Sequence, residues 1–161
     1  MAGPTYVKFN WTFRNQHIIL LIRLRGNEIL LKNIALIIDD DPRILDLLKV
    51  AVEETLGCEV VTAINGEQGL FEARRQEPDF ILLDWIMPEM TGLEMLDELK
   101  LDPATRSIPV YMITRKTRLE DARKAQEFGA EGYFLKPIIF EDLCVWLAEQ
   151  FPDQVSTQNS V

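Results

Sequence analysis

From Asn33 onward, short apolar runs alternate with longer stretches in which apolar residues recur at helical spacing. The first run, residues 34–38, is continuously apolar, which is typical of a parallel strand buried on both faces. Pro42 suits the first turn of a helix, where a backbone N–H would have no partner, and Gly57 suits the end of that helix. The same alternation continues to about residue 151, so the sequence predicts five strand and helix units.

The units are short and are joined by loops of a few residues. The predicted strands cover residues 34–38, 59–63, 80–83, 108–113 and 132–135. The predicted helices cover residues 42–56, 67–75, 93–101, 119–128 and 140–151, with Phe71 among the inward-facing residues of the second. Crossover connections between parallel strands are right-handed, so these units predict an α/β fold with a doubly wound parallel sheet.

This reading makes residues 33–151 one domain, with an N-terminal extension at residues 1–32 and a flexible tail at residues 152–161. The extension has two apolar runs, residues 18–24 and 29–31, on either side of Gly26 and Asn27. A hairpin fits this pattern, and so does a single amphipathic helix. A start site placed too far upstream would leave the extension without an evolved role, and the sequence does not decide between these readings.

Charge separates the extension from the rest of the chain. Residues 1–32 hold five basic residues and one acidic residue, whereas the remainder holds 12 basic and 25 acidic residues. An acidic body repels nucleic acid and anionic membranes, and no segment approaches the roughly 20 apolar residues of a membrane span. We expect neither DNA binding nor membrane insertion.

The two cysteines, Cys58 and Cys144, lie far apart in the sequence, and His17 is the only histidine. This pattern indicates neither a disulfide framework nor a zinc site. The cytoplasm is therefore the expected location.

The candidate chemistry lies where the predicted strands end. Asp39, Asp40 and Asp41 follow the first strand, and the third, fourth and fifth strands lead to Asp84, Thr114 and Lys136. The carboxyl ends of parallel strands share one edge, so these groups converge. Gathered carboxylates repel one another unless a cation is present, and oxygen ligands favour Mg²⁺, with Mn²⁺ also suitable. A carboxylate nucleophile, a metal, a lysine and a hydroxyl suit phosphoryl transfer.

Four motifs in this order and spacing make the chain resemble the receiver domain of two-component response regulators. They are Ile34 to Pro42 (IALIIDDDP), Leu83 to Gly92 (LDWIMPEMTG), Ile113-Thr114, and Gly129 to Pro137 (GAEGYFLKP). The resemblance covers about residues 33–151 and implies a flavodoxin-like sheet with strand order 2-1-3-4-5. It leaves the N-terminal extension uncovered.

The resemblance implies that Asp84 accepts a phosphoryl group from the phosphohistidine of a sensor histidine kinase or a histidine phosphotransfer protein. It implies that Asp40, Asp84 and the backbone carbonyl of Ile86 bind Mg²⁺ directly, with Asp39 acting through water. Thr114 and Lys136 would contact the phosphoryl oxygens, and Tyr133 would change rotamer as a switch. By the same resemblance the bond before Pro137 is often cis.

Several residues near these motifs have expected roles in helix capping, aromatic packing or partner contact. Asp41 is expected to act mainly as a helix cap. Trp85, next to Asp84, is expected to be a partly exposed ring that can report metal binding. Leu119 and Trp146 are predicted to form a surface that contacts a partner protein. The partner can be a second copy of this chain in a phosphorylation-dependent homodimer.

Three positions depart from the family pattern or vary within it. Arg115 stands where the family usually has a small residue, and its guanidinium would either clamp the phosphoryl group or hinder the donor. Ile86 and Lys116 occupy variable positions that tune hydrolysis of the aspartyl phosphate. An apolar Ile86 cannot orient an attacking water, so we expect a longer-lived phosphoryl state than in fast-cycling chemotaxis regulators.

The leading prediction is a receiver that switches protein contacts and catalyses only its own phosphorylation and dephosphorylation, apparently without an output domain. One alternative is a haloacid-dehalogenase-like phosphatase with Asp39 as its nucleophile. A second is a receiver-fold scaffold that works without phosphorylation. The kinase, the downstream partner and the direction of phosphate flow are not encoded in these motifs.

Overall fold

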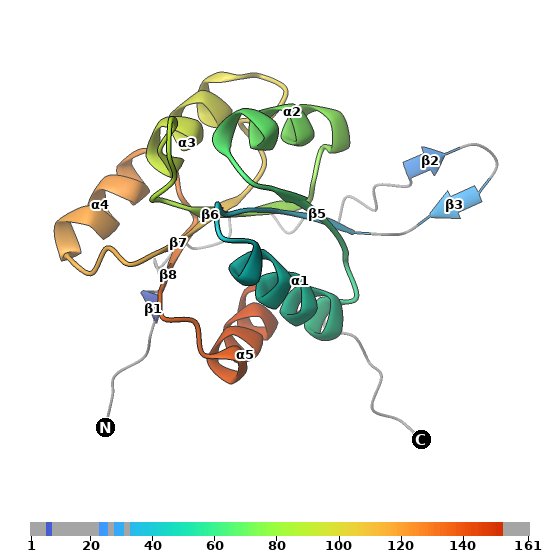
Figure 1. Ribbon diagram of the computed structural model, residues 1–161. Coiled ribbons are helices and arrows are strands. Elements are labelled where there is room, and N and C mark those ends of the chain that lie inside the picture. Colours follow the sequence, from blue (N-terminus) through green and yellow to red (C-terminus); the bar gives the residue numbers. More distant parts are fainter. Residues whose placement is uncertain (1–5, 8–22, 26–27, 31–32, 153–161) are drawn as a thin grey trace.

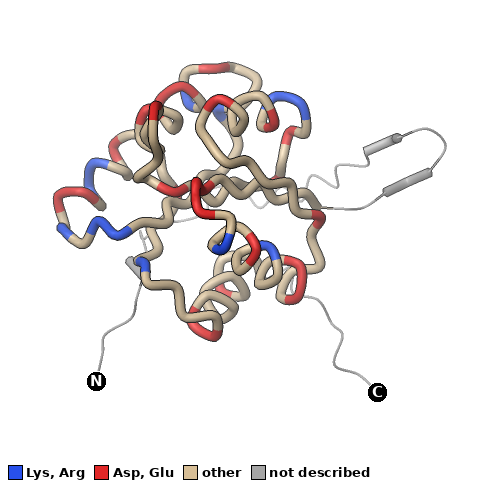
Figure 2. Tube along the Cα trace, in the orientation of Figure 1, with Lys and Arg blue, Asp and Glu red and all other residues tan. Residues whose placement is uncertain are grey.

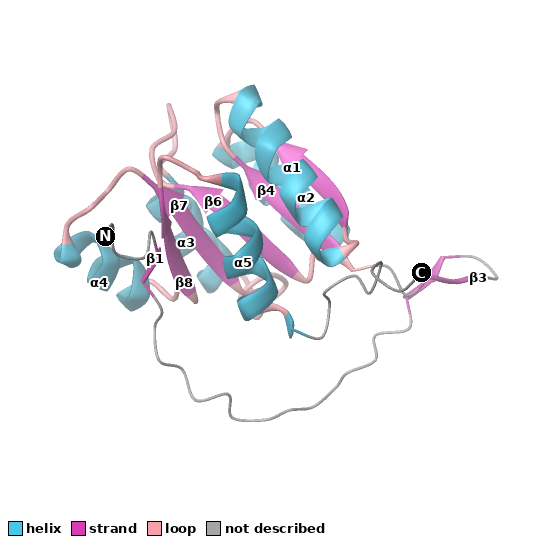
Figure 3. Ribbon diagram, turned by 90° about the horizontal axis from the view of Figure 1, so that it is seen from below, coloured by secondary structure: helices cyan, strands magenta, loops and turns pink. Residues whose placement is uncertain are grey.

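The computed structural model describes residues 6–7, 23–25, 28–30 and 33–152. Its central sheet lies between two layers of helices, with α1 and α5 on one face and α2, α3 and α4 on the other (Figures 1 and 3). The five helices are α1 (Pro42–Leu56), α2 (Gly66–Gln76), α3 (Gly92–Leu101), α4 (Leu119–Glu127) and α5 (Phe140–Gln150).

Five parallel strands form the body of the sheet: β4 (Ile34–Ile38), β5 (Glu59–Ala63), β6 (Phe80–Asp84), β7 (Val110–Thr114) and β8 (Gly132–Leu135). Their spatial order is β5-β4-β6-β7-β8, which is the predicted order 2-1-3-4-5. The strand order reverses between β4 and β6, and ligands of doubly wound sheets bind at such a point. The flavodoxin-like fold expected from the sequence is confirmed.

Local sequence accounts for the ends of the first helix. Asp41 caps its N-terminus by accepting a hydrogen bond from the Arg43 N–H, as predicted. Gly57 ends the helix at a φ of 65°, a left-handed conformation that glycine adopts without a side-chain clash. The start of α1, which follows the carboxyl end of β4, is therefore well defined.

The inner strands β4, β6 and β7 are buried on both faces, because each face packs against a helical layer, whereas the edge strand β5 is only partly buried. Leu36, Ile38 and Leu83 pack in the cluster that includes residues of α2 and α3, whereas Ile37 and Leu82 pack in the cluster that includes residues of α1 and α5. This alternation explains why the strands read as continuous apolar runs.

Two predictions about apolar residues are wrong. Phe71, expected to face inward, is 61% exposed on α2. Trp146, predicted to form a partner surface, is 1% exposed because its ring packs against Tyr111 and Phe134, with both centroid distances 5.4 Å. Trp146 is a core residue, and a partner cannot contact it in this fold. Leu119, the other residue of the predicted surface, is 62% exposed.

The N-terminal extension contributes strands. β2 (Arg23–Arg25) and β3 (Glu28–Leu30) pair antiparallel, which is the hairpin alternative for this segment. β1 (Tyr6–Val7) pairs antiparallel with β8, with Tyr6 opposite Phe134 and Val7 opposite Tyr133. The sheet therefore has a sixth strand that the sequence patterns did not predict. Residues 153–161 of the predicted tail lie outside the described residues.

Charge is distributed unevenly along the described backbone (Figure 2). Acidic residues directly precede α1 at the carboxyl edge of the sheet, and basic residues gather in the loop that precedes α4. No helix among the described residues is long and apolar enough to cross a membrane.

Candidate functional site

The ends of four parallel strands place the candidate residues at one edge of the sheet. Asp39 follows β4, Asp84 ends β6, Thr114 ends β7 and Lys136 follows β8. A cleft of about 460 Å³ opens there, and it is lined by Asp39, Asp40, Asp41, Ile44, Asp84, Ile86, Arg115, Lys136, Pro137 and Ile138. The predicted convergence is present in the structure.

Lys136 bridges two of the carboxylates. Its Nζ lies 2.6 Å from Oδ2 of Asp39 and 3.2 Å from Oδ1 of Asp84. The three side chains are 8%, 1% and 5% exposed, so the charges are largely removed from water. Burial of charge is tolerated only where charges are paired, so this cluster is held together by its own electrostatics.

Asp39, Asp40 and Asp84 also suit a divalent cation. Each offers a carboxylate oxygen, and these oxygens all lie within 4.8 Å of one another. Three carboxylates beside a single lysine leave net negative charge in the cleft, and a small hard cation compensates it with oxygen ligands. The donor set fits Mg²⁺ or Mn²⁺ better than zinc or copper, because none of the three is a nitrogen or sulfur ligand.

Burial raises the pKa of Asp84 to about 6. The positive charge of Lys136 lowers this pKa, the negative charge of Asp39 raises it, and a hydrogen bond from the Ile86 backbone lowers it. The desolvation effect is the largest of these causes. The fold therefore makes the Asp84 carboxylate costly to ionise.

The loop after Asp84 is held close to the strand end. Gly92 begins α3 so near the Asp84 carbonyl that a Cβ atom there would collide with it, and its N–H donates to the Trp85 carbonyl at 2.9 Å. Thr91 and Glu94 form a reciprocal capping box at the start of α3. Glycine at position 92 is therefore a packing requirement of the site.

Trp85 is buried rather than partly exposed, which corrects the expectation from the sequence. It is 7% exposed, and its ring meets the Tyr133 ring edge-on at a centroid distance of 6.2 Å. The ammonium group of Lys116 lies 5.8 Å from the centroid of the same indole. Trp85 is therefore a packed aromatic of the core and is not among the residues that line the cleft.

Thr114 and Tyr133 are connected through the loop after β7. Thr114 is fully buried and its Oγ1 accepts a hydrogen bond from the Lys116 N–H at 3.2 Å. Tyr133 points inward, is 1% exposed, and donates its hydroxyl hydrogen bond to the Lys116 carbonyl at 2.7 Å. The start of this loop is thereby fastened to both residues predicted to form the switch.

The remaining predicted positions lie at the mouth of the cleft or beyond it. Ile86 is 51% exposed and lines the cleft together with the exposed Arg115. The Lys136–Pro137 bond is cis, as the resemblance suggested. Leu119 begins α4 and does not line the cleft.

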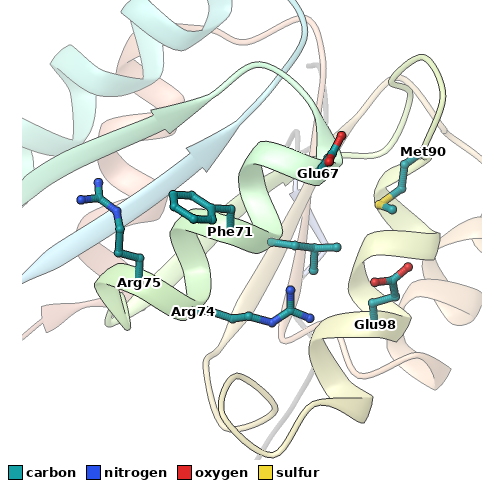
Figure 4. A pocket seen from close by; sticks show the side chains of 7 residues that line it. Glu67, Phe71, Arg74, Arg75, Met90 and Glu98 are labelled. Carbon is teal, nitrogen blue, oxygen red and sulfur yellow. The ribbon is translucent and has the colours of Figure 1, made fainter.

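A second cleft, of about 630 Å³, lies between α2 and α3 (Figure 4). Its lining residues are Glu67, Leu70, Phe71, Arg74, Arg75, Met90 and Glu98. Arg74 is paired with Asp102 and Arg75 with Glu72, so the two basic groups already have partners. The concentration of buried carboxylates and a buried lysine places the candidate site at the strand ends instead.

Comparison with known proteins agrees with this location. A family model described as the response regulator receiver domain matches residues 35–148. The protein PilH of Pseudomonas aeruginosa is 35% identical over 67% of this chain and 88% of its own length. The DNA-binding dual master transcriptional regulator RpaA of Synechocystis is 36% identical over 67% of this chain. The chain spans only 44% of RpaA, so that regulator is much longer than the matched region.

Solved structures give the same result. The chemotaxis protein CheY4 of Vibrio cholerae superposes with a TM-score of 0.68 at 29% identity, covering 73% of this chain and 98% of its own. A CheY-like receiver domain protein of Methanospirillum hungatei superposes with a TM-score of 0.66 at 31% identity, covering 76% of this chain and 96% of its own. The matched families are receivers, so the dehalogenase-like phosphatase alternative is not the family of this chain.

Proposed function

The chain belongs to the family of response regulator receiver domains, and on that basis we propose that Asp84 is its phosphoacceptor. The donor is the phosphohistidine of a sensor histidine kinase or of a histidine phosphotransfer protein. The product is an aspartyl phosphate that changes the contacts of this chain with another protein. The observation that carries the proposal is the buried ion-pair cluster in which Lys136 contacts both Asp39 and Asp84.

In this mechanism an Asp84 oxygen attacks the phosphorus atom and the histidine leaves. Lys136 donates to the phosphoryl oxygens from a position already within 3.2 Å of Asp84, which needs little reorganisation. Thr114 offers its hydroxyl from the neighbouring strand end. Mg²⁺, bound by Asp40, Asp84 and the Ile86 carbonyl with Asp39 acting through water, would supply positive charge for the phosphoryl oxygens.

Thr114 and Tyr133 transmit the phosphorylation of Asp84 to the surface of the molecule. If Thr114 turns its hydroxyl toward the phosphoryl group, it gives up its hydrogen bond with the Lys116 N–H. Because Lys116 also holds the Tyr133 hydroxyl, that change reaches Tyr133 through one residue. The consequence is a new arrangement of the loop before α4, where the exposed Leu119 begins the surface that a partner or a second copy contacts.

We propose protein contact rather than DNA contact as the output. The body of the chain is strongly acidic, and a phosphate backbone is repelled by such a surface. Cys58 and Cys144 do not form a disulfide, and a cytoplasmic location is part of this proposal.

Intact-mass analysis after incubation with acetyl phosphate and Mg²⁺ tests the proposal. The native chain should gain a single phosphoryl adduct, and Asp84→Asn should gain none. Asp97→Asn, which changes an exposed carboxylate of α3, is the matched control and should behave as the native chain. An adduct that survives Asp84→Asn, or no adduct on the native chain, would contradict the assignment of Asp84.

A further inference from the structure

The mouth of the cleft carries a cation that the proposed mechanism does not use. Arg115 directly follows the buried Thr114, so its backbone is fixed at the carboxyl edge of the sheet. Its side chain is exposed, yet it lines the same cleft as Asp84 and Lys136. The next residue, Lys116, is held through its N–H and its carbonyl in the unphosphorylated chain, so the loop keeps Arg115 at the cleft when a donor arrives.

Arg115 differs from the neighbouring cations in its partners. Lys136 is engaged by Asp39 and Asp84, and the ammonium of Lys116 lies over the Trp85 ring. Within residues 33–152, the Arg115 guanidinium makes no hydrogen bond or ion pair with another side chain. Its donors therefore remain available to a ligand in the cleft.

A guanidinium at this place suits one class of ligand. It is planar, permanently charged and able to donate two parallel hydrogen bonds to a phosphoryl group. The carboxylates that line the cleft repel an approaching dianion, and a cation at the mouth offsets that repulsion. Lys136 approaches from the buried side and Arg115 from the solvent side, so together they can bind different oxygens of one phosphoryl group.

We propose that Arg115 is a specificity residue that binds the phosphoryl oxygens of the incoming donor and of the aspartyl phosphate. This inference rests on the proposed function of Asp84. The Arg115 guanidinium favours small anionic phosphodonors such as acetyl phosphate. The Asp84 oxygen forms the new bond to phosphorus, the bond from phosphorus to the acetate oxygen breaks, and acetate leaves with that electron pair. Arg115 keeps its proton throughout.

The test compares Arg115→Ala, Arg115→Lys and a matched control, Arg118→Ala. Arg118 is an exposed arginine of the same loop that does not line the cleft and makes no side-chain cap on α4. Phosphorylation by acetyl phosphate with Mg²⁺ is followed by intact mass. We expect Arg115→Ala to be slower by about tenfold or more, Arg115→Lys to be intermediate, and Arg118→Ala to match the native chain.

A binding measurement separates phosphoryl recognition from a structural effect. Intrinsic tryptophan fluorescence, to which Trp85 next to Asp84 contributes, is followed during titration with beryllium fluoride, a phosphoryl analogue, in the presence of Mg²⁺. Arg115→Ala should weaken this binding by a similar factor while leaving binding of Mg²⁺ alone within about twofold of the native value. Equal or faster phosphorylation in Arg115→Ala would overturn the inference and show that Arg115 hinders the donor, with Asp84 still the acceptor. No adduct on the native chain would overturn both proposals.

Discussion

Lys136 lies closer to Asp39 than to Asp84, with Nζ to oxygen distances of 2.6 and 3.2 Å. The lysine thus has one tight partner that positions it and one looser partner with which the proposed chemistry occurs. A phosphoryl group on Asp84 can draw the ammonium away from that carboxylate while Asp39 keeps it in place. Asp39 has a positioning role in this arrangement in addition to its proposed part in metal binding.

Replacement of this lysine tests the coupling of the cluster. Lys136→Met leaves buried carboxylates without their cation, so we expect a loss of about 3 kcal/mol in the free energy of unfolding at neutral pH without Mg²⁺. Asp39→Asn combined with Lys136→Met removes one of those carboxylates and should lose less than the sum of the two single changes. Urea denaturation measures the free energy of unfolding of the native chain, the two single variants and the double variant. Additive losses would show that the two side chains do not interact.

The pH dependence of stability reports on Asp84. Its pKa in the folded protein, about 6, lies above the ordinary value of 3.8, so ionisation opposes folding. Protonated Asp84 therefore contributes stability to the folded protein that is fully present below about pH 4 and is lost as the pH rises through about 6. Asp84→Asn stays neutral, so it should be more stable than the native chain above pH 6 by roughly 2 kcal/mol without Mg²⁺.

Denaturation curves between pH 4 and pH 8 measure this difference. Asp97→Asn serves as the control because its carboxylate is exposed on α3. Added Mg²⁺ should stabilise the native chain above pH 6 and leave Asp84→Asn almost unchanged, since the metal binds the ionised carboxylate. Parallel pH profiles for the native chain and Asp84→Asn would refute the raised pKa.

Ile86 is expected to slow hydrolysis of the aspartyl phosphate. Its side chain is half exposed at the mouth of the cleft and has no group that can orient water. Ile86→Asn introduces such a group, and we expect loss of the phosphoryl adduct to be faster by about an order of magnitude. The decay is followed by intact mass after removal of acetyl phosphate. Ile64→Asn, at a similarly exposed position away from the cleft, should leave the decay rate unchanged.

Trp146 should matter for stability and not for association. Truncation of this buried ring in Trp146→Ala opens a cavity beside Tyr111 and Phe134, with an expected loss of about 3 to 5 kcal/mol. Leu119→Ala, at an exposed position, should stay within about 0.5 kcal/mol of the native chain. Thermal and urea denaturation measure both. A destabilisation by Trp146→Ala no larger than that of Leu119→Ala would contradict the core position.

Pairing of β1 with β8 can be tested by hydrogen exchange. Replacement of Tyr6 and Val7 together by proline removes both backbone donors of β1 and restricts φ, whereas replacement of both by alanine keeps the backbone able to pair. We expect faster amide exchange in β8 of the proline variant only. Equal exchange rates in the two variants would show that β1 does not protect this edge in solution.

The fold was largely predictable because its signals are local. The predicted strands at residues 34–38, 59–63 and 132–135 coincide with β4, β5 and β8. The limits of β4 are clear because a strand buried on both faces has few polar residues. β7 begins at Val110 instead of residue 108 because the Ile108 N–H closes a turn onto the Thr105 carbonyl. The apolar pattern does not show this turn, and the sign of it in the sequence is Pro109, which has no N–H to donate to a sheet.

The position of the site could be predicted from the sequence, whereas the burial of the aromatic residues around it could not. Asp84 and Lys136 stand at strand ends, and parallel pairing alone brings strand ends together. The depth of Trp85 and Trp146 depends on which aromatic rings meet them from distant segments, and helical or strand spacing does not encode that. β1 was missed because two residues are too few for a periodic pattern.

The position of β1 has a consequence for how this molecule meets others. β8 is the edge of the receiver sheet, and its outward backbone groups are a template for any extended chain. With β1 in place that template is already occupied, so a strand from another molecule must compete with a tethered segment of the same polypeptide. A tethered competitor acts at an effective concentration that dilution does not change. Recruitment at this edge therefore depends on the equilibrium for release of β1, and a change that weakens β1 raises the apparent affinity of every such competitor.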